Sequence, residues 1–118
     1  MNQKAIFPGQ YIQGSGAIKQ LPEIIAPFGK KAIILASPSV KQRIIPIYAQ
    51  ETINESIETV TFNGECTEEE IERLLLIIKQ TNSDIVIAMG GGKTIDTAKI
   101  AADRINLPVV VIPTIAST

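Results

Sequence analysis

Three consecutive glycines precede a lysine and a threonine in the segment GGGKT, residues 90–94, which follows the apolar run DIVIAM. Glycines let backbone N–H groups approach a ligand without interference from Cβ atoms. A helix that begins after them also directs the positive end of its dipole at the loop. A tight turn with a solvated lysine would need only one glycine. The segment therefore predicts the binding of a phosphate group.

Neither of two common phosphate-binding motifs fits this segment. A Walker A loop would need a glycine at position 87, where the chain has Ile87 inside the apolar run. A dinucleotide fingerprint beginning at Gly90 would place its third glycine at Ile95. About twenty residues after the loop, where that fingerprint needs an acid for the ribose, the chain reads VVV, residues 109–111. The spacing alone therefore leaves the phosphate ligand unnamed.

Asp96 lies just after the glycine segment, where we expect the first turn of the helix. A carboxylate there either favours the helix dipole or helps to orient a nucleotide or substrate, and both roles stay open. Thr97 and Lys99 are expected on the surface of the same helix.

Hydroxyl side chains follow two other apolar runs. Ser37 comes after AIILA, and the segment PTIAST, residues 113–118, carries Thr114 and Ser117 after PVVVI. In open α/β sheets, ligands bind beyond the carboxyl ends of the strands. We therefore expect Ser37, Thr114 and Ser117 at the same edge as the glycine segment.

The composition excludes several classes of function. The chain has no histidine, and therefore no imidazole base or imidazole metal ligand. Its single cysteine, Cys66, allows neither an internal disulfide nor a zinc site of several thiolates. A net charge of −1 and the absence of tryptophan argue against nucleic-acid binding. Without a membrane-spanning run or a signal-peptide pattern, we expect a cytoplasmic protein that does not bind membranes.

Four short apolar runs predict strands: Ala32–Ala36, Glu58–Phe62, Asp84–Met89 and Pro108–Ile112. Three of them are continuously apolar and rich in β-branched residues, as is typical of strands buried on both faces of a parallel sheet. The run Glu58–Phe62 alternates, which favours a place nearer the edge of the sheet.

Helical patterns lie between these runs. Thr67 and Glu70 have the spacing of a capping box, and an apolar stripe follows at helical spacing. A second stripe runs from Ile95 to Ile105. Ser37 and Pro38 predict the N-cap and first residue of a helix that Pro46 must kink or split. An earlier helix is expected between Ile18 and Phe28, interrupted by Pro22 and Pro27.

Strands separated by helices of this size imply right-handed βαβ crossovers. We therefore expect one α/β domain, residues 1–118, with a doubly wound, mostly parallel, Rossmann-like sheet. Pro8-Gly9, flanked by AIF and QYIQ, predicts a turn and thus a small N-terminal β-ribbon.

Several segments together resemble the N-terminal domain of glycerol dehydrogenases, in the metal-dependent group of the iron-containing alcohol dehydrogenase superfamily. These segments are PGQYIQG (8–14), FNGEC (62–66), GGGKTIDTAK (90–99) and PTIAST (113–118). The glycines with Lys93 and Asp96 mark the superfamily, whereas TIAST and FNGEC point to the glycerol branch. The resemblance spans essentially the whole chain.

The resemblance implies an NAD-binding domain. In the full-length enzyme it implies oxidation of the polyol glycerol to dihydroxyacetone, in a cleft between two domains of a homo-oligomeric protein. Gly91, Gly92 and Lys93 would line the pyrophosphate of NAD, while Thr114 and Ser117 would contact the nucleotide from the opposite loop. The implied cofactor site also includes Ser37, Thr94 and Asp96.

Two features depart from the family pattern. Members commonly carry an aspartate at the position of Ser37, and that acid binds the adenosine ribose. In the family, an aspartate that reaches the substrate lies beyond the position of Thr118. The metal ligands, which are another aspartate and two histidines, also lie beyond it. The resemblance thus implies zinc or iron only in the full-length enzyme, with no catalytic or metal-binding residue in this chain. We expect the isolated chain to be inactive.

Two alternatives stay open at this stage. A relative of dehydroquinate synthase or of glycerol-1-phosphate dehydrogenase would keep the fold and bind a phosphorylated substrate. A free-standing nucleotide-binding or oligomerisation module would have no catalytic activity. A coding sequence that continues past Thr118 with an acid and later histidines would favour the dehydrogenase.

Overall fold

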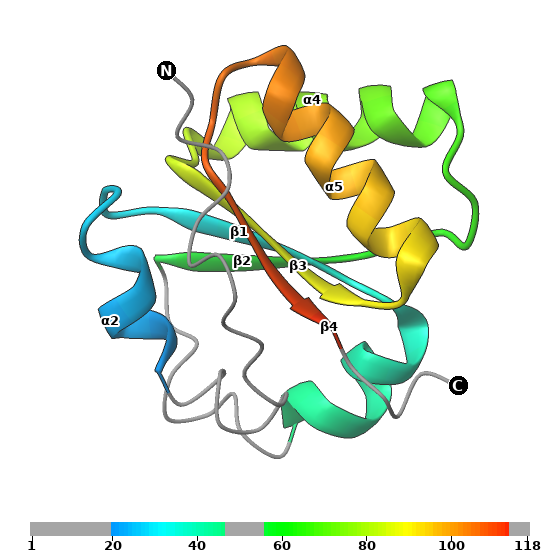
Figure 1. Ribbon diagram of the computed structural model, residues 1–118, viewed down its shortest axis with the longest axis horizontal. Helices are drawn as coiled ribbons and strands as arrows, with labels where there is room; N and C mark the ends of the chain where they lie inside the picture. Colours follow the sequence, from blue (N-terminus) through cyan, green and yellow to red (C-terminus); the bar gives the residue numbers. More distant parts are fainter. Residues whose placement is uncertain (1–19, 47–55, 114–118) are drawn as a thin grey trace.

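The computed structural model describes residues 20–46 and 56–113 (Figure 1). The strands in this part of the chain are β1 (Ala32–Ala36), β2 (Ile57–Thr61), β3 (Ile85–Gly90) and β4 (Val109–Pro113). The helical elements are α2 (Leu21–Ile25), the π-helix η1 (Val40–Ile44), α4 (Glu68–Thr81) and α5 (Gly92–Arg104). The expected N-terminal β-ribbon, Thr114 and Ser117 lie outside the described residues.

The strands form one sheet in the order β2-β1-β3-β4, and every pair is parallel. The parallel α/β architecture expected from the sequence is therefore confirmed. β1 has the expected bounds, and the other strands differ from the expected ones by a single residue at each end. β2 is an edge strand, as its alternating pattern predicts. Because β2 and β3 flank β1, the winding of the chain reverses between β1 and β3.

Helices cover both faces of this sheet. Figure 1 shows α4 and α5 on one face, and α2 with the helical segment after β1 on the other. Successive side chains of a strand point to opposite faces, so Ile33 and Leu35 pack with α4 and α5 while Ile34 packs with α2. Burying each such side chain contributes roughly 1.5–3 kcal/mol. Two apolar layers thus hold the sheet rigidly between the helices.

The start of α4 forms only half of the expected capping box. The Thr67 hydroxyl accepts a hydrogen bond from the Glu70 N–H at 3.1 Å. The Glu70 carboxylate does not return this bond to Thr67. It accepts instead from the Asn63 N–H at 3.0 Å and from the Arg73 guanidinium at 2.6 and 2.7 Å. The acid therefore ties the helix to the preceding loop rather than to its own cap.

α5 differs from expectation at two residues. Because it begins at Gly92, its first turn holds no acid and Asp96 lies in the second turn. Thr97, expected on the surface, is fully buried. It continues the buried stripe of Thr94, Ala98 and Ala101, and its hydroxyl donates to the Lys93 carbonyl at 2.9 Å. A threonine can join this stripe because that bond satisfies its hydroxyl.

The helical segment after β1 begins as expected at Pro38, but without a side-chain cap. The Ser37 carbonyl accepts from the Lys41 N–H at 2.9 Å, whereas the Ser37 hydroxyl makes no hydrogen bond within the described structure. Any effect of Pro46 on the chain after it concerns residues 47–55, which are not described. The earlier helix is found as α2, with Pro22 in its first turn.

Candidate functional site

The candidate site lies at the carboxyl edge of the sheet, where β1 and β3 end side by side. Ala36 and Met89 are partners in the register of these strands, and the Ser37 N–H donates to the Met89 carbonyl at 3.0 Å. Ser37 and the glycine segment, 53 or more residues apart in sequence, are therefore adjacent in the fold. The winding reverses between these two strands, which is where open α/β sheets bind their ligands.

Gly90 joins the two strand ends through close packing. Its φ is +155°, and a Cβ there would lie 2.9 Å from the Ser37 Cβ and 3.1 Å from the Thr94 hydroxyl oxygen. The first distance is shorter than real Cβ contacts, and the second is tighter than most of them. The Ser37 and Thr94 side chains therefore leave no room for a larger residue at position 90. The packing requires a glycine there, irrespective of any ligand.

Gly92 differs from Gly90, since a Cβ at Gly92 would meet no atom of the described residues within 4 Å. The packing of the described residues thus does not require a glycine at this position. Gly92 is exposed, and the space that a Cβ would occupy is open within the described structure. This observation fits a phosphate group at the start of α5.

The first turn of α5 offers hydrogen-bond donors to such a group. Gly91 is the N-cap and has no side chain that could cap the helix. The first N–H groups of a helix lack intrahelical acceptors, and the helix dipole makes this end positive. Because its first turn holds no acid, α5 does not compensate its positive end with a side chain of its own.

The Ser37 hydroxyl is the most informative polar group at this edge. Ser37 is 8% exposed, and its Oγ is the buried side-chain oxygen that has no hydrogen-bond partner in the described part of the chain. Leaving a buried hydroxyl unsatisfied costs about 1–3 kcal/mol. A ligand that bonds to Ser37 would remove that cost. The hydroxyl therefore fits a contact to a polar ligand at the end of β1.

Lys93 is held differently from what its position in the glycine segment predicts. Its ammonium lies 3.1 Å from both carboxylate oxygens of Glu65, and the two side chains are 63% and 68% exposed. Glu65 belongs to the loop that follows β2 and so reaches the same edge of the sheet. Sequence reasoning missed Glu65, although its place in the loop that follows a predicted strand was a usable signal.

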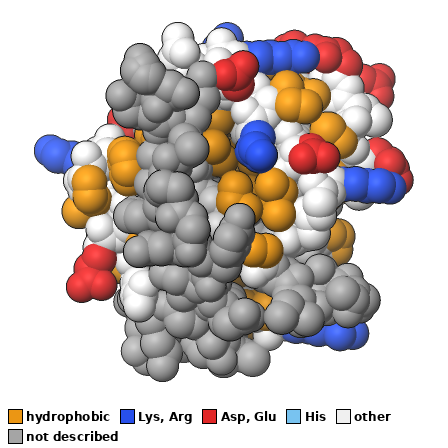
Figure 2. All heavy atoms as spheres, viewed as in Figure 1, with side chains coloured by type: hydrophobic (Ala, Val, Ile, Leu, Met, Phe, Trp, Pro, Cys, Tyr) orange, Lys and Arg blue, Asp and Glu red, His pale blue; other side chains and the backbone are white. Residues whose placement is uncertain are grey.

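The remaining predicted residues divide between the interior and the surface. Thr94 is buried behind the glycines, whereas Asp96 is exposed in the second turn of α5. Positive and negative side chains are interspersed over α4 and α5 in Figure 2. Within residues 20–46 and 56–113, no group of three Asp, Glu, Cys or His side chains could hold a metal ion. None of the helices described here has the length and apolarity to cross a membrane.

Comparison with known proteins gives consistent results. The model of the iron-containing alcohol dehydrogenase family matches residues 8–118. A glycerol dehydrogenase of Thermotoga maritima is 42% identical over 118 residues, which cover 96% of this chain and 31% of that protein. A glycerol dehydrogenase of Pseudomonas putida is 36% identical over 125 residues, covering 100% of this chain and 33% of the relative.

A solved structure has the same fold. The crystal structure of a probable glycerol dehydrogenase from Sinorhizobium meliloti superimposes with a TM-score of 0.73 at 41% identity, covering 94% of this chain and 30% of that one. The chain therefore spans about a third of the length of the curated relatives that it matches. From the family match over nearly its whole length, the chain belongs to the iron-containing alcohol dehydrogenase family.

Proposed function

We propose that the chain, residues 1–118, is the NAD-binding domain of a metal-dependent glycerol dehydrogenase. The observation that carries the proposal is the pairing of an unsatisfied Ser37 hydroxyl with an open glycine backbone at the reversal point between β1 and β3. The relatives named glycerol dehydrogenase supply the substrate class, a small polyol.

Each residue at the sheet edge has a proposed role toward NAD. The backbone N–H groups of Gly91 and Gly92 and the ammonium of Lys93 hold the pyrophosphate. The Ser37 hydroxyl contacts the adenosine ribose, where family members commonly carry an acid. Thr94 packs against Gly90 and supports the loop from behind.

Three further residues complete the proposed site. Thr114 and Ser117 would contact the nucleotide from the segment that follows β4, because β4 ends at the same edge of the sheet as β3. Asp96 is exposed in the second turn of α5 and is a candidate for orienting the nucleotide rather than for holding the pyrophosphate.

The proposed chemistry divides between the cofactor and the protein. When bound, NAD accepts a hydride from the alcohol carbon. This chain binds and orients the nucleotide at the sheet edge. Because the described residues do not fit a metal ion, we derive no metal-dependent step from them. The zinc or iron of the proposed enzyme and its catalytic residues would come from the rest of the full-length enzyme, which we propose is a homo-oligomer.

Calorimetric titration with NAD tests the proposal. Lys93→Ala removes a charge-assisted contact to phosphate, which is worth about 1.5 kcal/mol or more, so the dissociation constant should rise about tenfold. Lys99→Ala is the matched control, because Lys99 is an exposed lysine on the same helix. Equal affinities of the two variants would contradict the assignment of Lys93, and absence of NAD binding to the unmodified chain would contradict the proposed function.

A further inference from the structure

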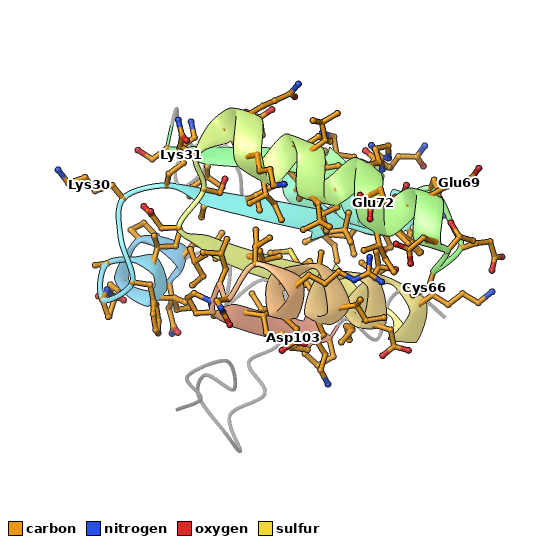
Figure 3. All side chains as sticks on the ribbon, turned by 90° about the horizontal axis from the view of Figure 1, so that it is seen from above. Lys30, Lys31, Cys66, Glu69, Glu72 and Asp103 are labelled. Atoms are coloured by element: carbon orange, nitrogen blue, oxygen red, sulfur yellow. The ribbon has the colours of Figure 1, made fainter. Side chains whose placement is uncertain are left out.

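The loop between β2 and α4, residues 62–66, forms a second side of the candidate site. Its first residue, Phe62, is buried and donates its N–H to the Ala36 carbonyl at 2.8 Å, directly before Ser37. Figure 3 shows Cys66, near the end of the loop, beside the start of α5. The loop thus extends from the end of β1 to the helix that begins with Gly92.

A buried ionic network fixes this loop. The Glu70 carboxylate, which is fully buried, accepts from the Asn63 N–H and from Arg73. Arg73 also donates to the Thr61 carbonyl at 2.8 Å. The network therefore anchors the chain on either side of Phe62 to the first turn of α4.

The backbone of Glu65 is held from both directions. Its N–H donates to the Asn63 side-chain oxygen at 3.1 Å, and its carbonyl accepts from the Thr67 N–H at 3.1 Å. Glu65 consequently projects its carboxylate from a constrained position. The side chain itself remains exposed, so it can move without disturbing the core.

The Glu65 carboxylate lies where a phosphate would meet Lys93. Both of its oxygens are 3.1 Å from the Lys93 ammonium. Carboxylates and phosphates both present negatively charged oxygen acceptors. The two groups therefore compete for the single positive charge of the Lys93 ammonium. The Glu65 carboxylate therefore occupies the ammonium of Lys93 that the phosphate of NAD would contact.

We propose that Glu65 is an internal competitor for the dinucleotide phosphate and sets the affinity of the site. This inference rests on the proposed function. In the free protein Glu65 neutralises Lys93. When the dinucleotide binds, its phosphate takes over the ammonium and the Glu65 side chain turns into solvent. The ion pair that must break is a cost to binding, and removal of Glu65 removes that cost.

The test compares Glu65→Gln with Glu69→Gln by calorimetric titration with NAD. Both substitutions remove one negative charge. Glu69 is exposed near the start of α4, as Figure 3 shows, whereas the ion pair of Lys93 is with Glu65. An exposed ion pair is worth little, so Glu65→Gln should tighten NAD binding by about 1.5- to fivefold. Glu69→Gln should leave the dissociation constant unchanged.

A double-mutant cycle identifies the origin of the gain. In a Lys93→Ala background, Glu65→Gln should no longer tighten binding, because there is no ammonium left to release. An unchanged or weaker affinity of Glu65→Gln, or a gain that persists without Lys93, would overturn the inference while leaving NAD binding intact. If neither the unmodified chain nor the variants bind NAD, both the inference and the proposed function are wrong.

Discussion

Ser37 and Gly90 lie in van der Waals contact at the ends of two adjacent parallel strands, so closely that a Cβ on Gly90 would be 2.9 Å from the Ser37 Cβ. This contact brings the strand end that carries a hydroxyl to the strand end that begins the glycine segment. The two glycines therefore have different roles. Gly90 is needed for close packing against Ser37, whereas a Cβ at Gly92 would point into space that the described residues leave open.

Gly90→Ala should destabilise the fold. The φ of +155° is unfavourable for any residue with a Cβ, and Ser37 and Thr94 would have to move. Strain of this kind costs about 1–3 kcal/mol, and we expect the free energy of unfolding to fall by that amount. Urea denaturation measures the change.

Gly92→Ala is the matched substitution and should have the opposite profile. Alanine favours a helix, so the free energy of unfolding should stay constant or rise by up to about 1 kcal/mol. The new Cβ would occupy the approach to the backbone, and the dissociation constant for NAD should rise several-fold. If Gly92→Ala binds NAD normally, the open space beside Gly92 does not receive the pyrophosphate.

Ser37→Ala should separate binding from stability. Removing a buried hydroxyl without a partner should keep or raise the free energy of unfolding, by about 1 kcal/mol, while NAD binds more weakly. Ser83→Ala is the control. Ser83 is equally buried, at 7% exposure, and its hydroxyl is bonded to Thr81 at 2.7 Å. This second variant should lose about 1 kcal/mol of stability and keep its NAD affinity.

Glu70 should make the fold sensitive to acid. Burial is the largest influence and acts to raise the pKa of the Glu70 carboxyl, but hydrogen bonds from Arg73 and the Asn63 N–H together outweigh it and hold the pKa below its usual value. A lowered pKa in the folded state contributes stability above the unfolded pKa, near 4.5, and that stability is lost as the pH falls through the folded value.

The free energy of unfolding should therefore decline below about pH 4.5 in the unmodified chain, and less steeply in Glu70→Gln. At neutral pH the substitution itself should cost about 1–3 kcal/mol, because Arg73 loses its charged partner. Urea denaturation at several pH values measures both effects. An identical pH dependence in the two proteins would show that the Glu70 network does not couple proton binding to folding.

The sequence predicted the strands closely because continuous β-branched runs have few alternatives to a buried strand. β1, with every residue buried, was found with its expected bounds. The same patterns placed Ser37 and the glycines at one sheet edge, since parallel strands all end on the same side. These inferences needed only periodicity and topology.

These patterns could not predict which residues from other segments form hydrogen bonds or ion pairs with a given side chain. The Thr67–Glu70 spacing predicts a reciprocal cap, but it cannot reveal that Asn63 and Arg73 offer the Glu70 carboxylate better donors. Lys93 was predicted to hold a pyrophosphate, and the sequence pattern could not reveal that Glu65, from another loop, forms an ion pair with it. Thr97 was expected on the surface. The sequence could not reveal that its hydroxyl bonds to the Lys93 carbonyl and can therefore be buried.

Backbone amide NMR during titration with NAD tests the central claim most directly, because it locates the ligand without any substitution. If NAD binds at the glycine segment, the largest shift changes should fall on the amides of Gly91, Gly92 and Lys93, with a further change at Ser37. Saturable changes confined to other parts of the sheet or helices, with these four amides unmoved, would contradict a dinucleotide site at the ends of β1 and β3.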